Sequence, residues 1–206
     1  MNGRRLCYDF AHSMPKTLYL TRHGETDWNR EGRWQGHTDI ALNDVGRAQA
    51  AALAQRLAGR HIGHVAASDL ARARETAEIV ARHLGLPRVH VDQRLRERSF
   101  GVFEGLTREE VASRYPGEWA DYQENRRVTP PGAEPHDLVI GRVKAAVLDV
   151  AQAAPEAEAA LIVSHGGSLR VLIAAVTGEE IPPVPNAAVY RLLLDEGGFG
   201  RVERVD

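Results

Sequence analysis

Cysteine is nearly absent from this chain, which has only Cys7 among its 206 residues. One cysteine cannot form an intrachain disulfide or build a thiolate metal site. This usage is compatible with a reducing compartment, and we expect a cytoplasmic protein. The sequence also lacks an apolar run of the roughly 20 residues needed to span a bilayer. We therefore expect no membrane partner.

Neither sign of charge dominates, because the formal net charge is −2. Without a broad basic excess, a general nucleic-acid-binding function is not expected. Lysine is scarce, with only Lys16 and Lys144, so arginine supplies nearly all the cations. Hydrophobic residues make up 43% of the chain, which is enough for a packed core. The length fits one α/β domain with a small insertion.

Several motifs that would indicate a bound group are missing. The chain contains neither G-x-x-x-x-G-K-[ST] nor G-x-G-x-x-G, which excludes the common nucleotide-binding loops. His61 and His64 are close in sequence, but no pattern such as H-E-x-x-H surrounds them. We therefore expect no metal site and no cofactor.

Short apolar runs alternate with amphipathic segments along the chain. The pattern predicts strands at residues 17–21, 62–67, 89–91, 160–163, 188–194 and 201–205. It predicts helices at residues 43–58, 68–84, 107–114, 118–126, 137–153 and 168–176, with a long polar loop at 24–42. This order indicates an α/β protein, a three-layer α/β/α sandwich with a mostly parallel central sheet. Residues 16–206 would form the domain, with a small, mainly helical inserted cover at about 98–136. Residues 1–15 would be an N-terminal extension, with disorder as one possibility.

Polar clusters fall where the predicted strands end. After the first strand, Arg22 can pair with phosphate oxygens, His23 can act as a nucleophile or an acid–base group, and Gly24 lets the backbone approach a ligand. Ser164-His165-Gly166-Gly167 follows another strand and opens a helix, whose N-terminus is a natural anion site. Ligands of such sheets bind beyond the carboxyl ends of the strands. Both histidines are therefore expected at one site.

Two further segments offer charged partners. Arg72 is predicted in the first turn of a helix, where the dipole disfavours a cation, so a buried Arg72 should face an anion. Arg74 is expected to be solvated. The glycine-rich loop at 94–105 carries two carboxylates. Of these, Glu97 and Glu104, we expect Glu104 to be structural and to accept hydrogen bonds from backbone amides.

Five motifs, in this order, make the chain similar to the histidine phosphatase (phosphoglycerate mutase-like) superfamily, in its phosphatase branch. They are Leu20-Thr21-Arg22-His23-Gly24-Glu25-Thr26; Gly32-Arg33-Trp34-Gln35-Gly36 with Asp39 and Leu42; Ser68-Asp69-Leu70-Ala71-Arg72-Ala73 with Thr76-Ala77; Glu97 with Phe100-Gly101 and Glu104-Gly105; and Ser164-His165-Gly166-Gly167. The similarity extends from Lys16 to about Val176.

The resemblance implies a role for each of these residues. His23 would be the nucleophile that forms a phosphohistidine, and Glu97 would protonate the leaving oxygen and then activate water. Arg22, Arg72 and His165 would hold the phosphoryl group and stabilise its developing charge. The residues implied to contact phosphate or substrate are Arg22, Gly24, Thr26, Asn29, Gln35, Gly36, Arg72 and Gly166.

The expected function is therefore a metal-independent phosphomonoester hydrolase that acts on a small phosphorylated metabolite. Attack by a neutral imidazole splits hydrolysis into two in-line steps. Two arginines and a second histidine can supply the fixed positive donors without a metal. A cofactor-dependent phosphoglycerate mutase is the alternative, and a non-catalytic phospho-ligand-binding module is a third hypothesis.

Departures from the mutase pattern favour hydrolysis. Glu97-Arg98 and Arg126-Arg127 are similar to mutase segments. However, mutases typically carry Glu-Arg-His-Tyr-Gly where this chain has Ser99-Phe100, a lysine where it has Arg108, and an asparagine where it has Gly167. The segment between Glu97 and His165 is also shorter than in those mutases, which leaves less material to exclude water from a phosphoenzyme. The sequence identifies neither the phosphomonoester nor the oligomeric state, for which a homodimer is one possibility.

Overall fold

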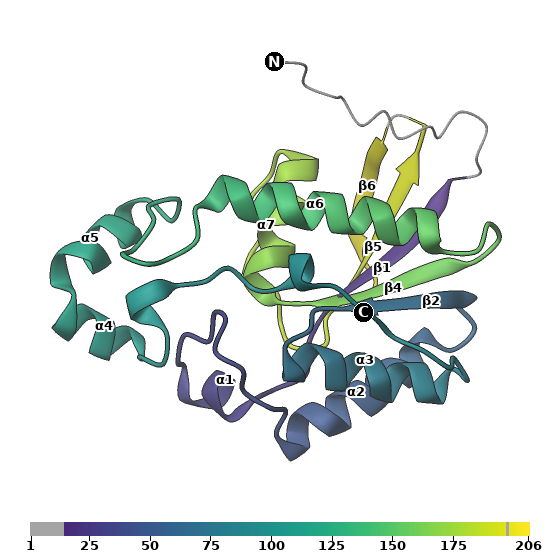
Figure 1. Ribbon diagram of the computed structural model, residues 1–206, viewed down its shortest axis with the longest axis horizontal. Coiled ribbons are helices and arrows are strands. Elements are labelled where there is room, and N and C mark those ends of the chain that lie inside the picture. Colours follow the sequence, from purple (N-terminus) through teal and green to yellow (C-terminus); the bar gives the residue numbers. More distant parts are fainter. Residues whose placement is uncertain (1–14, 197) are drawn as a thin grey trace.

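The computed structural model describes residues 15–196 and 198–206, so the predicted N-terminal extension lies almost entirely outside the described residues. The described chain contains a six-stranded sheet in the order β3-β2-β4-β1-β5-β6 (Figure 1). Parallel pairing joins β1 (Lys16–Arg22), β2 (Ile62–Ala67), β3 (His90–Val91) and β4 (Ala159–Ser164). Antiparallel pairing adds β5 (Val189–Asp195) to β1, and β6 (Gly198–Arg204) to β5. The predicted mostly parallel sheet is confirmed.

Helices cover both faces of this sheet, as predicted. Figure 1 shows α6 (His136–Ala153) and α7 (Gly166–Thr177) on one side, and α2 (Asp44–Leu57) and α3 (Ala71–His83) on the other. The central strand β1 is buried on both faces because its side chains alternate between the two cores. Leu18 and Leu20 belong to the core under α6 and α7, whereas Tyr19 belongs to the core over α2 and α3.

The predicted long loop at 24–42 contains a short helix, α1 (Asp27–Glu31). Thr26 caps this helix: its hydroxyl accepts a hydrogen bond from the Asn29 amide at 3.1 Å, and the Asn29 side chain accepts from the Thr26 amide at 3.2 Å. The usual sequence signature of such a capping box has Glu or Gln at the third helical position. Asn29 replaces that residue here, so the signature does not predict the helix.

The inserted segment forms a small unit with its own apolar cluster. The 3₁₀ turn η1 (Gln93–Leu95) precedes it. The segment itself contains the 3₁₀ turn η2 (Gly101–Phe103), then α4 (Arg108–Arg114) and α5 (Pro116–Glu124). Phe103, Val111 and Tyr122 are buried in this cluster, and Trp34 from the segment after α1 packs against them. The ring centroids of Trp34 and Tyr122 are 5.6 Å apart. These contacts join the inserted unit to the loop that follows the first strand.

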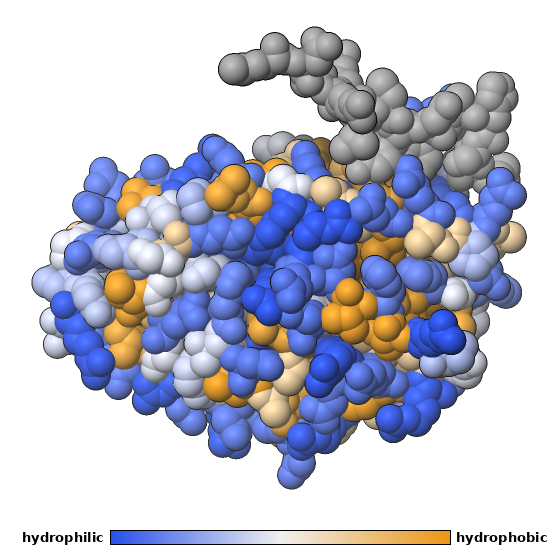
Figure 2. Space-filling view, viewed as in Figure 1, coloured by the Kyte–Doolittle hydropathy of each residue, from blue (hydrophilic) through white to orange (hydrophobic). Residues whose placement is uncertain are grey.

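Hydrophilic side chains occupy most of the face shown in Figure 2, and apolar ones are scattered among them. Among residues 15–196 and 198–206, no helix is both long enough and apolar enough to cross a membrane.

Candidate active site

The pairing of β1 with β4 brings the two histidine motifs together. Arg22 is in register with Ser164, and the His23 amide donates to the Ser164 carbonyl at 3.0 Å. The next residue on each strand is a histidine, so the rings of His23 and His165 meet with centroids 5.2 Å apart. The predicted meeting of these two residues at one end of the sheet is confirmed.

The His23 ring has one nitrogen fixed and one available. Its Nδ1 lies 2.6 Å from the Gly24 carbonyl oxygen, which can only accept, so Nδ1 carries the proton and Nε2 keeps a lone pair. Burial, followed by the positive charges of Arg72 and Arg22, holds the pKa of His23 well below its ordinary value of 6.5. At neutral pH this imidazole is uncharged and can attack an electrophile.

Arg72 is fully buried, although it carries a charge. Its two terminal nitrogens donate to the carbonyls of Gly36 at 2.8 Å and Thr38 at 2.9 Å. Burial lowers the pKa of Arg72 to about 10, so the guanidinium remains charged at neutral pH. The Nε of Arg72 has no hydrogen-bond partner among the described residues.

Arg22, at the end of β1, also has a terminal nitrogen bonded to a backbone carbonyl and an Nε without a partner among the described residues. One terminal nitrogen donates to the Val184 carbonyl at 2.8 Å, while its buried Nε has no partner within the described chain. His165 is also buried, and neither of its ring nitrogens is bonded to any described residue. Burial and the neighbouring Arg72 hold the pKa of His165 well below 6.5, so it is a neutral ring with one N–H to donate. Free donors of this kind suit an anion.

The N-terminus of α7 is already occupied by a side chain, the carboxyl group of Glu97. The amides of Gly167 and Ser168 each donate to this carboxylate at 2.8 Å, and the Arg98 amide adds a third bond at 2.9 Å. The predicted anion site at this helix start is therefore used by a side chain of the protein. The helix begins at Gly166, slightly before the predicted residue 168. A Cβ at Gly167 would lie 2.5 Å from a Glu97 oxygen, so glycine lets this carboxyl group lie close to the start of the helix.

A cavity of about 490 Å³ opens over these groups. Eight of the predicted site residues line it: Arg22, His23, Asn29, Gln35, Gly36, Arg72, Glu97 and Gly166. His165 lies behind them, against His23. Gln35 contributes a buried Oε1 that has no partner in the part of the chain described. The cavity therefore combines free donors with one free acceptor.

Two predicted phosphate-binding residues, Gly24 and Thr26, do not line this cavity. The Gly24 amide donates to the Thr76 hydroxyl at 3.0 Å, and a Cβ at this position would lie 2.4 Å from the Gly46 carbonyl oxygen. Gly24 therefore lets two backbone segments pack closely. Thr26 is fully buried because it caps α1. Glu104 is structural as predicted, and it accepts bonds from the backbone amides of Phe100, His37 and Thr38.

Two residues near the site are not predicted by the sequence motifs. Asn186 donates from its side chain to the His23 carbonyl at 3.0 Å and to the Asn29 side chain at 3.2 Å. It lies in a loop after several prolines, where nothing in the pattern distinguishes it. Arg142, in the middle of α6, donates to the Glu97 carbonyl at 2.9 Å and forms an ion pair with Glu134 at 2.7 Å. Its helical spacing alone predicts an ordinary surface arginine.

A buried neutral histidine that faces arginines at the carboxyl end of the central strand defines, in this α/β fold, a site for a phosphate-like anion. A family model described as histidine phosphatase superfamily (branch 1) matches residues 18–206. The chain belongs to this superfamily.

Its relatives include mutases and phosphatases by name. Phosphoglycerate mutase-like protein 4 of Arabidopsis thaliana is 36% identical over 185 residues, which cover 87% of this chain and 80% of that protein. A probable phosphoglycerate mutase of Erwinia tasmaniensis is 40% identical over 191 residues, 90% of this chain and 84% of that protein. The structure of a mycobacterial glucosyl-3-phosphoglycerate phosphatase in complex with VO3 superposes with a TM-score of 0.81 at 30% identity, covering 93% of this chain and 98% of that one. An enzyme of phosphorylated compounds is thus supported, and the names differ on the reaction.

Proposed function

We propose that this protein is a metal-independent phosphomonoester hydrolase that acts on a small phosphorylated metabolite through a phosphohistidine on His23. One observation carries the proposal. Buried donors without partners among the described residues, the Nε atoms of Arg22 and Arg72 together with the His165 ring, converge beside a neutral His23. Unsatisfied buried donors cost stability, and a phosphoryl group would satisfy them.

The first chemical step transfers the phosphoryl group to the enzyme. The lone pair of His23 Nε2 forms a bond to phosphorus while the bond from phosphorus to the alcohol oxygen breaks. Protonated Glu97 gives its proton to that oxygen, and the alcohol leaves. Arg22, Arg72 and His165 stabilise the charge on the equatorial oxygens, which is the largest contribution a site can make to this reaction.

The second step returns the enzyme to its starting state. Glu97 is now a carboxylate and takes a proton from a water molecule while the oxygen of that water attacks phosphorus. The bond from phosphorus to His23 breaks, inorganic phosphate leaves, and the imidazole is again neutral. The bonds from Gly167 and Ser168 to Glu97 hold the carboxylate in one place through both steps.

Access of water supports hydrolysis over transfer to a second substrate. Arg108 and Arg126 line the cavity from the inserted segment, and both are exposed to solvent. Gly167 also departs from the mutase pattern at a residue that contacts the acid–base group directly. The phosphoglycerate mutase reaction is the second candidate, because the relatives from Arabidopsis and Erwinia carry that name.

Phosphate release and phosphoenzyme trapping test the proposal. Wild type should release phosphate from phosphomonoesters. A denaturing quench at alkaline pH should trap ³²P from a labelled substrate on the protein, because the bond from phosphorus to nitrogen in phosphohistidine is labile in acid. His23→Ala should lose both, while His83→Ala, on the exposed end of α3, should keep both. Equal phosphate release by wild type and His23→Ala would overturn the mechanism. If neither wild type nor any variant releases phosphate, the result would instead favour the non-catalytic phospho-ligand-binding module.

A second assay separates hydrolysis from mutase activity. The enzyme is incubated with 3-phosphoglycerate and a trace of 2,3-bisphosphoglycerate, and the products are separated. Free phosphate should exceed 2-phosphoglycerate. Rapid formation of 2-phosphoglycerate with little free phosphate would establish the mutase.

A further inference from the structure

A second cavity, of about 240 Å³, adjoins the catalytic cavity between α6 and α7. Both cavities are lined by Phe100, Tyr122, Arg126, Gly167 and Arg170, so they meet along this wall. Beyond the shared wall, the second cavity reaches His136 and Ile140 of α6 and Val171 and Ala174 of α7. We call this second cavity the side chamber.

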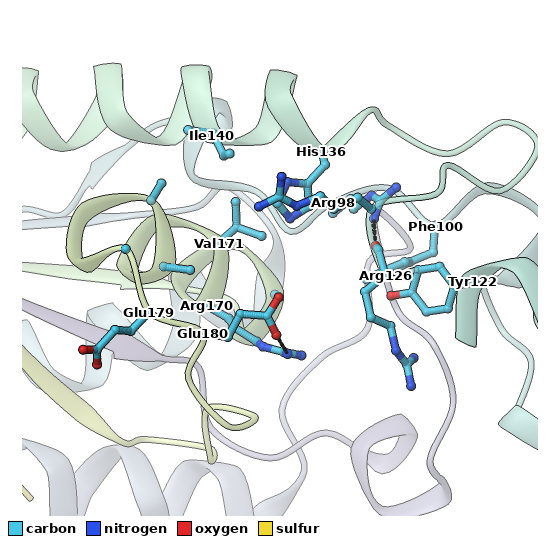
Figure 3. A pocket seen from close by; sticks show the side chains of 15 residues that line it. Arg98, Phe100, Tyr122, Arg126, His136, Ile140, Arg170, Val171, Glu179 and Glu180 are labelled. Atoms are coloured by element: carbon cyan, nitrogen blue, oxygen red, sulfur yellow. Dashed lines mark hydrogen bonds and ion pairs between the residues drawn. The ribbon is translucent and has the colours of Figure 1, made fainter. Parts of the chain in front are cut away.

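One part of the side chamber is apolar. Figure 3 shows Ile140 on α6 and Val171 on α7 projecting into the space between the two helices. Phe100 and Tyr122 add aromatic surface at the junction with the catalytic cavity. Walls of apolar and aromatic side chains with a few polar groups are typical of pockets for small molecules.

The junction between the cavities is cationic. Arg126 lies with its guanidinium 4.9 Å from the centre of the Tyr122 ring and forms no ion pair with any described carboxylate. Arg170 reaches Glu180 only at 3.5 Å, and that carboxylate is 80% exposed, so the pair leaves most of the charge available. In Figure 3 both arginines lie at the end of the side chamber that is away from Ile140 and His136. Four arginines line the side chamber, Arg98, Arg126, Arg127 and Arg170, against two carboxylates, Glu179 and Glu180, so positive charge is in excess there.

The position of Glu97 directs the leaving alcohol toward this junction. Gly167 donates to the Glu97 carboxylate at 2.8 Å, and Gly167 belongs to the shared wall. An alcohol oxygen that takes its proton from Glu97 must therefore lie next to the entrance of the side chamber. Farther in, His136 has a buried Nδ1 with no partner in the described chain, so an additional polar group can be bound there.

We propose that the side chamber holds the far end of the substrate's alcohol half, so that the substrate is the phosphomonoester of a bulky acidic alcohol with more than three carbons. Its acidic group would lie between Arg126 and Arg170, and its apolar face would pack on Val171 and Ile140. This inference rests on the proposed function, because it places the phosphoryl group at His23 and the leaving oxygen at Glu97.

The test introduces a large side chain on the wall of the side chamber, so that the chamber is filled. In Ala174→Phe the added ring occupies the space beside Val171, whereas Ala153→Phe, at the exposed end of α6, places the same ring elsewhere and serves as the control. Two acidic probes are compared: 3-phosphoglycerate, which is small, and 4-carboxyphenyl phosphate, which is bulky. The ratio of variant to wild-type kcat/KM cancels the different leaving abilities of the two alcohols. Ala174→Phe should lower kcat/KM for the bulky probe at least about tenfold more than for the small one, the range expected for overpacking in a filled pocket.

A binding measurement separates this inference from the proposed function. In a His23→Ala background, calorimetry with the same probes should show weaker binding of only the bulky probe after Ala174→Phe. Equal losses for both probes, or no loss for either, would overturn the side-chamber proposal. Absence of phosphate release from both probes in wild type would overturn the hydrolase instead, and the binding comparison would still decide the chamber's role.

Discussion

The imidazole rings of His23 and His165 are both buried and meet at an interplanar angle of 60°. Each is held neutral mainly by burial, and next by the positive charge of Arg72. The pair forms at the ends of two neighbouring parallel strands. This arrangement keeps a nucleophile unprotonated, and it also makes the stability of the fold depend on pH.

We expect the free energy of unfolding to fall as the pH drops below about 6.5. Each histidine takes up a proton near pH 6.5 in the unfolded chain, whereas the pKa of both is well below that value in the folded chain. The unfolded state therefore binds more protons, and stability falls by up to about 1.4 kcal/mol per pH unit for each histidine. In guanidinium titrations between about pH 7 and pH 5, His165→Gln should show a shallower decline than wild type. The exposed His83→Gln should decline like wild type, and an unchanged slope for His165→Gln would contradict the prediction.

Arg72→Lys should reduce phosphate release far more than Arg74→Lys. Arg72 is fully buried, and its planar fork bonds two carbonyls while its Nε stays available, which a lysine cannot reproduce. Loss of one positioned donor typically costs about 10² to 10³ in kcat. Arg74 is exposed and pairs loosely with Glu78 at 3.6 Å, so its replacement should change kcat less than about twofold. Arg72→Lys should also bind the inhibitor vanadate more weakly than wild type, whereas Arg74→Lys should bind it as wild type does. Similar kinetics for the two variants would remove Arg72 from the phosphoryl site.

The sequence predicts the layers of the fold and most of the site because both depend on local signals. Apolar strands, helix caps and the position of each polar cluster at a strand end suffice to bring His23 and His165 together. What it does not predict depends on contacts between distant segments. The sequence predicts an anion site at the N-terminus of α7, and only the structure shows that the Glu97 side chain already occupies it. Likewise, the motif around Gly24 does not reveal that this residue packs against Gly46.

Gly24→Ala should destabilise the fold even though Gly24 does not line the cavity. The added methyl group would lie 2.4 Å from the Gly46 carbonyl oxygen, and backbone must move to relieve the contact. Overpacking of this kind costs about 1 to 3 kcal/mol. Gly117→Ala is the matched control: it lies in α5 with no atom within 4 Å of the new methyl group, so it should stabilise by a few tenths to about 1 kcal/mol. Urea titrations of both variants measure the difference. Equal stabilities would mean that the two backbone segments separate at little cost.

Arg142→Lys should impair the acid–base step specifically. The Arg142 guanidinium donates to the carbonyls of Arg94 and Arg96 at 2.7 Å and of Glu97 at 2.9 Å, so it fixes the backbone that carries Glu97. Its ion pair with Glu134 in turn fixes the guanidinium. Lysine lacks the planar fork, so Glu97 would be displaced. General acid catalysis supplies a rate enhancement of about 10² to 10⁴, and we expect the displacement to remove about tenfold of it.

The leaving group distinguishes this positioning role from a loss of structure. A poor leaving group such as an alkyl alcohol needs protonation, whereas p-nitrophenolate leaves with little help. Arg142→Lys should therefore lower kcat/KM, which reports the step that releases the alcohol, by about tenfold for 3-phosphoglycerate and by much less for p-nitrophenyl phosphate, as Glu97→Gln should do more strongly. Arg114→Lys, at the exposed end of α4, should leave both rates unchanged. If Arg142→Lys lowers kcat/KM equally for both substrates, Arg142 stabilises the fold without orienting Glu97.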